Sequence, residues 1–398
     1  MKSDFMFTSD SVTEGHPDKL CDQISDAIVD RFMAQDHHAN VSAECAVSRG
    51  VVFIAARFAS SAQVDVTEVA RGVIEQVGYR QGEFSARDCT ILTSLTELPP
   101  DVERITCLER SAAGDIDCLP VRNQVTVFGF ACNQTPAMMP LPIWLAHRLA
   151  RRLTAVRLNE ELPYLAPDGK TQVGVEYRNR KPHRIHSITL IASQTTADQP
   201  DIEVLCEDLK RLVIDPTFAD EKVRPDKNTR IFINPEGAVI GGGPSLHSGL
   251  TGRKTAVDTY GEYARHSGAA LSGKDPMRID RIGAYAARYA AKNVLAAGLA
   301  DECEVQLSYT IGLAQPVSVQ VETFGTATLD ENEIAQRLQA HMDFSPASIL
   351  NRFRLLQLSR ELDGGLYRKL AAYGQVGRTD IDLPWEQTDL AEQLKTGR

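Results

Sequence analysis

The chain has 398 residues, 43% of them hydrophobic and 24% charged, and its 43 Lys and Arg face 53 Asp and Glu for a net charge of −10. These proportions are typical of a globular protein of two or three domains, and they exclude a disordered chain, a fibrous repeat and a coiled coil. The acidic balance argues against a nucleic-acid-binding protein, because neutralising a phosphate backbone needs a basic surface. A local basic cluster can still bind a small anion.

No stretch of the sequence is predicted to contact a membrane. The most apolar runs are interrupted by Arg57, by Arg148 and by Arg288 with Lys292, far short of the ~18 apolar residues that a membrane span needs. The N-terminus has no apolar core of a secretory signal. None of the eight cysteines form a CxxC pair, so we expect reduced, buried thiols in a cytoplasmic protein.

The first third of the chain alternates between helix and strand patterns. Leu20, Ile24, Ile28 and Phe32 recur at four-residue spacing, which predicts a helix over 18–35. The other elements predicted in this part are strands over 41–47, 51–58 and 89–95, and a helix over 65–77 that ends at Gly78.

The stretch 96–123 shows no regular period. It contains three prolines, several charges and two cysteines. A loop of this length inside a compact chain is usually disordered or a functional lid, so we expect a mobile loop here.

Regular patterns resume after residue 123 and continue to about residue 324. The predicted strands are 125–131, 172–178 paired with 185–193 through a turn at 179–182, 230–234, 302–311 and 316–324. The predicted helices are 143–158, 201–213 and 280–298. This rhythm of strands, hairpins and helices predicts an α+β fold, with helices packed on one face of antiparallel or mixed sheets.

Glycine and basic residues are concentrated between 234 and 281. Arg253, Lys254 and Lys274 lie among glycine-rich turns, where backbone amides and cationic side chains can both approach phosphate oxygens. A solvated surface loop is the simpler interpretation for any one of these turns, but the three basic residues together favour a polyphosphate site. The spacing is neither that of a Walker P-loop nor that of a dinucleotide-binding glycine motif.

Two possible helix starts carry further polar residues. His16 lies beside Pro17 at the start of the helix predicted at 18–35, and Asp18 and Asp280 each open a helix. Either aspartate could be a plain N-terminal cap. A polyphosphate site of this size would also need Mg²⁺, which prefers one or two carboxylates together with phosphate oxygens and water.

Motifs in order along nearly the whole chain resemble the S-adenosylmethionine synthetase (methionine adenosyltransferase) family. They are 14–19 (EGHPDK), 232–235 (FINP), 252–254 (GRK), 257–261 (VDTYG), 272–275 (SGKD), 284–288 (AYAAR), 294–300 (VLAAGLA), 371–374 (AAYG) and 384–386 (PWE). The resemblance implies three similar α+β domains with interleaved chain crossings. We expect an N-terminal domain over 1–101, a mobile active-site loop over 102–122, a central domain over 123–233 and a C-terminal domain over 234–398.

The resemblance also implies the reaction and the assembly. Methionine sulfur would attack C5′ of ATP, and the released tripolyphosphate would be hydrolysed to pyrophosphate and phosphate. The thioether has no proton to lose, so catalysis should rest on positioning and electrostatics. A homodimer with active sites between the subunits, or a dimer of such dimers, is expected, with Mg²⁺ and K⁺ as cofactors.

Site residues carry over from the family position by position. His16 would meet the O5′ bridge of ATP, Asp18 and Asp280 would hold Mg²⁺, and Glu44 would hold K⁺. Asp258 would bind the nucleoside and substrate, and Ile311 would line the substrate pocket. The residues expected at the triphosphate are Asp168, Lys170, Arg253, Lys254, Lys274 and Arg278, and of these Lys170, Arg253 and Lys274 join His16 as the catalytic set.

Several positions depart from the family pattern. Arg57 stands where the family has a Glu that meets the methionine ammonium, Leu98 replaces a Gln, and Asn123 replaces an acid. An alternative alignment would place 114–116 at the acid's position. Arg278 replaces a Lys, and small aliphatic residues around Val239 replace an aromatic residue near the adenine.

Charge reversal at Arg57 is the largest of these changes. Two unit charges about 4 Å apart interact by roughly 4 kcal/mol at an effective dielectric constant of 20, so reversing one sign changes affinity by several powers of ten. Arg57, Leu98 and Asn123 would then contact methionine or a methionine-like nucleophile without an α-ammonium. An ATP or tripolyphosphate hydrolase and a silent nucleotide-binding partner of a true synthetase are the remaining alternatives.

Overall fold

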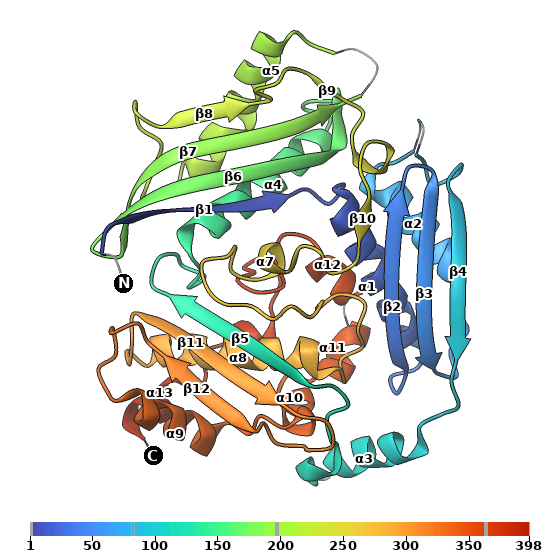
Figure 1. The fold of residues 1–398 in the computed structure, drawn as a ribbon, viewed down its shortest axis with the longest axis vertical. Helices are drawn as coiled ribbons and strands as arrows, with labels where there is room; N and C mark the ends of the chain where they lie inside the picture. The colour runs from blue at the N-terminus through green and yellow to red at the C-terminus, as the bar shows by residue number, and fades with distance from the viewer. Residues whose placement is uncertain are drawn as a thin grey trace.

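The computed structural model describes residues 3–80, 82, 84–112, 114–195, 199–361 and 365–397, and it contains three sheets, each with helices on one face (Figure 1). Sheet A consists of β1 (Phe5–Val12), β6 (Leu165–Arg178), β7 (Lys181–Gln194) and β8 (Arg230–Ile233), with β9 (Val239–Ile240) also paired to β7. Sheet B consists of β10 (Gly249–Leu250), β2 (Asn40–Ser48), β3 (Val51–Ala59) and β4 (Thr90–Glu97). Sheet C consists of β12 (Ser318–Glu322), β11 (Glu302–Tyr309) and β5 (Val125–Cys132).

Helices cover each sheet from one side. Sheet B packs on α1 (Pro17–Gln35) and α2 (Val66–Val77), while sheet A packs on α4 (Leu141–Leu158), α5 (Ile202–Leu209) and α6 (Asp215–Phe218). Sheet C packs on α8 (Ile279–Ala296), near α9 (Glu331–His341), α10 (Pro346–Arg352) and α13 (Ala391–Thr396). The remaining helices are α3 (Val102–Ala112), α7 (Thr255–Asp258), α11 (Leu355–Glu361) and α12 (Tyr367–Leu370). The α+β prediction is therefore confirmed.

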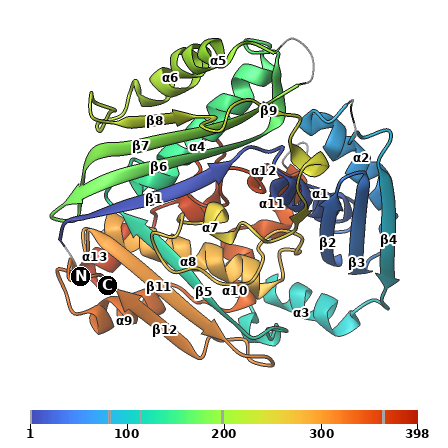
Figure 2. The ribbon, with the colours of Figure 1, turned by 45° about the horizontal axis from the view of Figure 1, so that its top comes forward.

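Each sheet takes a strand from a distant part of the chain. β1 pairs with β6 of the middle of the chain, β5 pairs with β11 of the last third, and β10 pairs with β2 of the first third. In Figure 2, β1 forms the edge of sheet A that faces the rest of the molecule, and α7 lies beside it. These crossings join the three sheets, and the expected domain boundaries stay a prediction.

The described residues form two hydrophobic cores. One lies between sheet A and α4, with Leu145, Val175 and Ile188 among its members. The other is continuous beneath sheets B and C and includes Ile24 of α1 and Tyr285 of α8. Because both helices are buried over most of their length, they hold the polar residues at their N-termini in fixed positions.

Most of the predicted elements are present, with two differences. The predicted loop at 96–123 contains helix α3, because the Asp101 carboxylate accepts the Arg104 N–H (3.0 Å) and the Arg104 guanidinium donates to Asp275 (3.2 Å). The helix is a difference from the loop expected over 96–123, and the mobility expected for 102–122 stays a prediction. The helix predicted at 201–213 is α5 followed by a π-helical turn, Lys210–Ile214, and α6.

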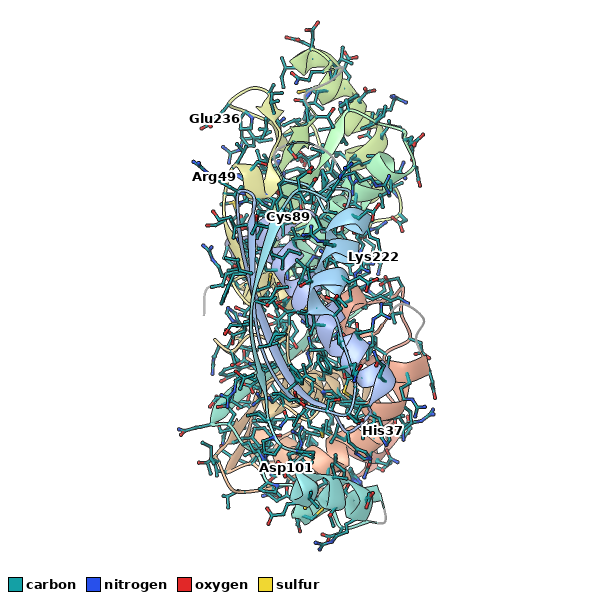
Figure 3. The ribbon with its side chains drawn as sticks, turned by 90° about the vertical axis from the view of Figure 1, so that its right-hand side faces the viewer. His37, Arg49, Cys89, Asp101, Lys222 and Glu236 are labelled. Carbon is teal, nitrogen blue, oxygen red and sulfur yellow. The ribbon has the colours of Figure 1, made fainter. Side chains whose placement is uncertain are left out.

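One face of sheet B carries none of the described helices. Figure 3 views the molecule from the side, with α1 and α2 behind one face of the sheet and its other face open. Among the described helices, none is long and apolar enough to cross a membrane.

Candidate active site at the starts of helices α1 and α8

The loop before α1 places His16 at the helix N-terminus. His16 is the N-cap, with an extended backbone, and its Nδ1 accepts the backbone N–H of Asp18 at 3.2 Å. Pro17 follows at the first helical position, where its fixed φ suits the helix and no N–H is needed. Both His16 and Asp18 are buried, with 3% and 4% of their surface exposed.

The β9–β10 segment brings a second histidine to the same place. His247 Nε2 lies 2.9 Å from Asp168 Oδ2, which also accepts the Gly243 N–H at 2.8 Å. The rings of His16 and His247 lie with centroids 5.0 Å apart. We call His16, Asp18, Asp168, His247, Arg253 and Lys254 the α1 cluster.

The basic residues of the α1 cluster follow strand β10, and the strand places them beside α1. Asp18 Oδ1 accepts the Leu250 N–H at 3.1 Å, and Arg253 Nη1 and Lys254 Nζ lie 3.7 and 3.9 Å from the same carboxylate. This approach requires Gly249, since a Cβ there would lie 2.2 Å from the carbonyl of Pro17. A larger residue would push β10 and both cations away from α1.

Burial sets the ionisation of the α1 cluster. Burial lowers the pKa of His16 to about 4, although Asp168 and Asp18 oppose the shift. Burial also raises the pKa of Asp168, but the hydrogen bond from His247 and the charge of His16 outweigh it, so this pKa lies below its ordinary value. At neutral pH the cluster therefore presents a neutral His16 beside an ionised Asp168.

Lys170 lies two residues beyond Asp168 on β6. It pairs in register with Val12 of β1 and Ile191 of β7, and its side chain is exposed. The Thr13 N–H donates to the Gly169 carbonyl (2.9 Å), which ties the loop before His16 to β6. Lys170 is thus exposed beside the α1 cluster.

A second group of predicted residues gathers at the start of α8. Asp280 is 1% exposed, accepts a hydrogen bond from Asn123 Nδ2 (2.7 Å) and lies 3.4 Å from Lys274 Nζ. Arg278 is the N-cap residue of the same helix. We call Asn123, Lys274, Arg278 and Asp280 the α8 cluster.

Opposing influences act on the pKa of Lys274 in the α8 cluster. Burial lowers the pKa of Lys274, Asp280 raises it, and the nearby Arg281 and Arg278 lower it further. The net shift is downward. A polyanion placed here would offset the repulsion among the three cations.

The two clusters contact the same strand at different points. Leu250 of β10 pairs with Ala46 of β2, whereas Lys274 forms an isolated bridge with Ser42. Four residues along a strand span about 13 Å. The structure therefore separates the predicted site residues into two clusters within one chain.

The open face of sheet B carries two further predicted residues. Glu44 on β2 and Arg57 on β3 are both exposed there. Arg57 pairs in register with Ser42, the residue that bridges to Lys274. Beside them lie the exposed apolar side chains of Val51 (43%), Phe53 (43%) and Leu92 (52%).

Leu98 and Ile311 lie at two other edges. The Leu98 N–H donates to the Phe58 carbonyl (2.8 Å), directly after β4. Ile311 is 64% exposed in the turn after β11, where Gly312 and Leu313 pair with Val121. Ile311 therefore lies beside the end of the segment expected to form the active-site loop.

Asp258 does not lie on the surface of either cluster. It is fully buried and pairs with the equally buried Lys19, whose Nζ also donates to Asp22 Oδ2 at 2.8 Å. The Oδ2 of Asp258 is buried and has no hydrogen-bond partner among the described residues. Within this chain Asp258 ties α7 to α1 through Lys19, and its expected contact with nucleoside and substrate stays a prediction.

His247 and Lys19 are the polar residues that sequence reasoning missed. His247 lies in an aperiodic glycine-rich segment, where no hydrophobic pattern fixes its direction. Lys19 reads as an exposed residue of the first helical turn. In the sequence, His247 stands out only as a histidine between two glycine-rich turns, shortly before Arg253 and Lys254.

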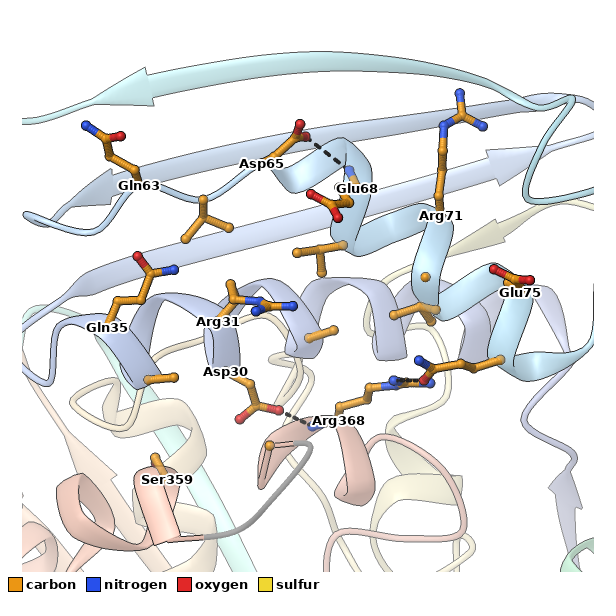
Figure 4. A pocket seen from close by; sticks show the side chains of 18 of the residues that line it. Asp30, Arg31, Gln35, Gln63, Asp65, Glu68, Arg71, Glu75, Ser359 and Arg368 are labelled. Carbon is orange, nitrogen blue, oxygen red and sulfur yellow. Dashed lines mark hydrogen bonds between the residues drawn. The ribbon is translucent and has the colours of Figure 1, made fainter.

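A separate cleft of about 910 Å³ lies between α1, α2 and the C-terminal helices (Figure 4). Its lining includes Asp30, Arg31, Arg71 and Arg368 and contains none of the predicted site residues. The carboxylate of Asp30 accepts the N–H groups of 366–368 at 2.8–3.1 Å. The hydrogen bonds to Asp30 join the C-terminal segment to α1, and the cleft beside them is distinct from the two clusters.

Comparison with known proteins identifies the family. Models of the N-terminal, central and C-terminal domains of S-adenosylmethionine synthetase match residues 4–100, 119–239 and 240–387. An S-adenosylmethionine synthase of Trichodesmium erythraeum is 47% identical over 409 aligned residues, covering 99% of this chain and 97% of that protein. One of Gloeothece citriformis is 48% identical over 405 residues, covering 98% and 96%. The chain belongs to the S-adenosylmethionine synthetase family.

Proposed function

We propose that the protein transfers the adenosyl group of ATP to the sulfur of methionine, forming S-adenosylmethionine. The observation that carries this proposal is the match to named S-adenosylmethionine synthases at 47–48% identity over 98–99% of the chain. The α1 and α8 clusters supply cations and carboxylates of the kind that a triphosphate leaving group requires. Released tripolyphosphate is then hydrolysed to pyrophosphate and phosphate.

The transfer step needs no general base. A sulfur lone pair forms the S–C5′ bond while the C5′–O5′ bond breaks and its electron pair leaves with the tripolyphosphate. His16 stabilises that oxygen: because its Nδ1 accepts the Asp18 N–H, a neutral ring carries its proton on Nε2 and can donate it in a hydrogen bond. The developing charge is met by a preorganised dipole.

Positive side chains bind the triphosphate. We assign Lys170, Arg253 and Lys254 to one side of it and Lys274 with Arg278 to the other. Lysine supplies a compact charge and arginine a two-pronged donor, and together they balance a leaving group of several negative charges. The Asp168 carboxylate contacts His247 and accepts the Gly243 N–H on the side of the triphosphate assigned to Lys170.

Asp18 and Asp280 are the carboxylates that fit Mg²⁺. Each is almost fully buried and lies within 4 Å of a lysine ammonium, beside the groups assigned to phosphate. Mg²⁺ bound with phosphate oxygens would neutralise charge on the leaving group. Glu44, an exposed carboxylate on β2, is the proposed K⁺ ligand.

We further propose a homodimer formed through the open face of sheet B. The face combines exposed apolar side chains with Arg57, and a two-fold axis across it would bring the α1 cluster of one copy toward the α8 cluster of the other. That arrangement explains why one chain holds two half-sites about 13 Å apart along β2. Arg57, Leu98, Asn123 and Ile311 would then line the methionine pocket.

Methionine is the favoured nucleophile despite Arg57. The relatives that match over nearly the whole chain are named S-adenosylmethionine synthases, and neither the hydrolase nor the silent-partner alternative gains support from the structure. The reversed charge is expected to weaken the hold on the substrate ammonium, and another group of the pocket must meet it.

The test is a product assay with ATP, Mg²⁺ and K⁺, with and without methionine. Mass spectrometry should detect S-adenosylmethionine only when methionine is present, with pyrophosphate and phosphate formed in equal amounts. Lys170→Met should reduce the rate at least a hundredfold, while Lys222→Met, at an exposed lysine outside both clusters, should leave it unchanged. Phosphate release without an adenosylated product would overturn the proposal.

A further inference from the structure

We infer that His16, Asp168 and His247 form a binding site for a divalent transition metal ion of the Zn²⁺ or Co²⁺ class. One ligand atom from each residue lies within 4.8 Å of the others, and His16 and Asp168 are buried. The expected competition between this metal and ATP rests on the proposed function, because the site overlaps the place assigned to ATP. Metal binding itself does not depend on that proposal.

The donor set selects the class of metal. Two imidazoles and one carboxylate suit Zn²⁺, Co²⁺, Ni²⁺ and Fe²⁺, whereas Mg²⁺ prefers oxygen ligands and water. Asp18 and Asp280, which offer oxygen alone, are the residues assigned to Mg²⁺. The protein would thus have two chemically distinct cation sites, one for Mg²⁺ together with ATP and one for the transition metal when ATP is absent.

The spacing of the three residues fits a metal. Ligand atoms about 2.1 Å from a tetrahedral ion are about 3.4 Å from one another. The distance of 2.9 Å between His247 Nε2 and Asp168 Oδ2 and the outer limit of 4.8 Å lie on either side of this value. Small side-chain rotations would complete the geometry.

Asp168 has a free lone pair inside the cluster. The residue is 8% exposed, and its buried Oδ1 has no hydrogen-bond partner among the residues that the structure describes. Leaving a buried carboxylate oxygen unsatisfied is costly. A metal ion between the two imidazoles would satisfy it.

His16 can become a ligand with one proton shift. Its Nδ1 accepts the Asp18 N–H, so Nε2 is the ring nitrogen left to bind a metal. When Nε2 binds a metal, the ring proton moves to Nδ1, the hydrogen bond from the Asp18 N–H is given up, and Nδ1–H can turn toward Asp18 Oδ2, 3.8 Å away. The result is a carboxylate–histidine–metal chain, the arrangement that orients most metal-bound histidines.

The charge around the cluster permits a dication. Asp18 and Asp168 supply two negative charges, while Arg253 and Lys254 lie 3.7 and 3.9 Å from Asp18 and supply two positive ones. Phosphate-binding cations therefore compete with the metal for the carboxylates. We expect the metal to bind the ATP-free protein and to exclude ATP by occupying His16.

The test measures metal binding directly, without nucleotide. The full-length protein is stripped with a chelator and titrated with Co²⁺, whose visible absorption reports low-symmetry coordination, and then with Zn²⁺ by calorimetry. We expect one site per chain and at least a tenfold loss of affinity in His247→Gln. His183→Gln, at an exposed histidine on β7, should bind like the wild type.

Two further measurements make the outcome decisive. Asp168→Asn should lose the same absorption while keeping the wild-type circular dichroism spectrum, and anomalous scattering from Zn²⁺-soaked crystals should place one ion between the three residues. Absence of stoichiometric binding, or equal affinity in His247→Gln, would overturn the inference. Adenosyl transfer by the chelated enzyme with Mg²⁺ is measured separately, so failure of the proposed function and failure of this site give different results.

Discussion

At the scale of single residues, the buried ion pair of Lys19 is the clearest point of vulnerability. Its ammonium is enclosed by Asp22 and Asp258, and none of these side chains is exposed. Burial lowers the pKa of Lys19, but the two carboxylates outweigh it and the pKa rises above its ordinary value. Removing the ammonium leaves two buried carboxylates without their counter-charge.

Lys19→Met should therefore reduce the free energy of unfolding by about 3–5 kcal/mol, the cost of breaking a buried ion pair. Urea unfolding measures the loss. Lys222→Met, which removes the same atoms from the surface, should change stability by less than about 0.5 kcal/mol. Adding Asp258→Asn to Lys19→Met should recover part of the loss, and a purely additive double variant would contradict this account.

Arg57 offers a second prediction at the residue scale. If it lines the methionine pocket, Arg57→Glu replaces a repulsive charge by an attractive one toward the substrate ammonium, and the KM for methionine should fall at least tenfold. Steady-state kinetics at saturating ATP measure the change. Arg49→Glu, at the exposed β2–β3 turn, is the matched control, and an unchanged KM in both variants would remove Arg57 from the pocket.

At the scale of elements, the missing side chain of a glycine on β5 lets α8 pack closely on sheet C. A Cβ on Gly129 of β5 would lie 1.9 Å from the backbone of Ala287 in α8, and the helix cannot retreat without opening the core. Gly129→Ala should cost more than about 3 kcal/mol by overpacking. Gly72→Ala in α2, where nothing lies within 4 Å of the new Cβ, should stabilise by about 0.5–1 kcal/mol. Thermal unfolding of both variants checks the pair, and equal effects would contradict it.

The junction between α1 and α12 predicts a pH dependence. Burial raises the pKa of Asp30 to about 7, although the N–H groups of Arg368 and Tyr367 oppose the shift. The folded state then binds the proton more tightly than the unfolded state, so this contribution favours folding at low pH and is lost as the pH rises from about 4 to about 7. The stability of the wild type relative to Asp30→Asn should fall over this range by at most about 4 kcal/mol. A difference that is constant from pH 4 to pH 8 would contradict the assignment.

Sequence periodicity predicted the buried elements better than the edges. The helix over 18–35 and the hairpin of β2 and β3 follow from side-chain spacing alone, because one face of each is buried. β1 has no comparable pattern, since its place depends on hydrogen bonds to β6, more than 150 residues away. The same limit applies to His247, whose contact with Asp168 is made by the β9–β10 segment and by no local rule.

At the scale of the whole molecule, the two half-sites and the open face of sheet B lead to one prediction. Phe53 is 43% exposed at the centre of that face, and Phe53→Glu would place a charge where we expect an apolar interface to close. The variant should be monomeric by light scattering and should lose adenosyl transfer at least a hundredfold, because the α1 and α8 clusters would no longer face each other across two chains. Ile231→Glu, at a comparably exposed position on β8 of sheet A, should stay dimeric and active. When the Phe53→Glu variant is mixed with wild-type protein at high concentration, the activity should exceed that of the wild-type protein alone by little. A monomeric variant that keeps full activity would show instead that one chain completes the site by itself.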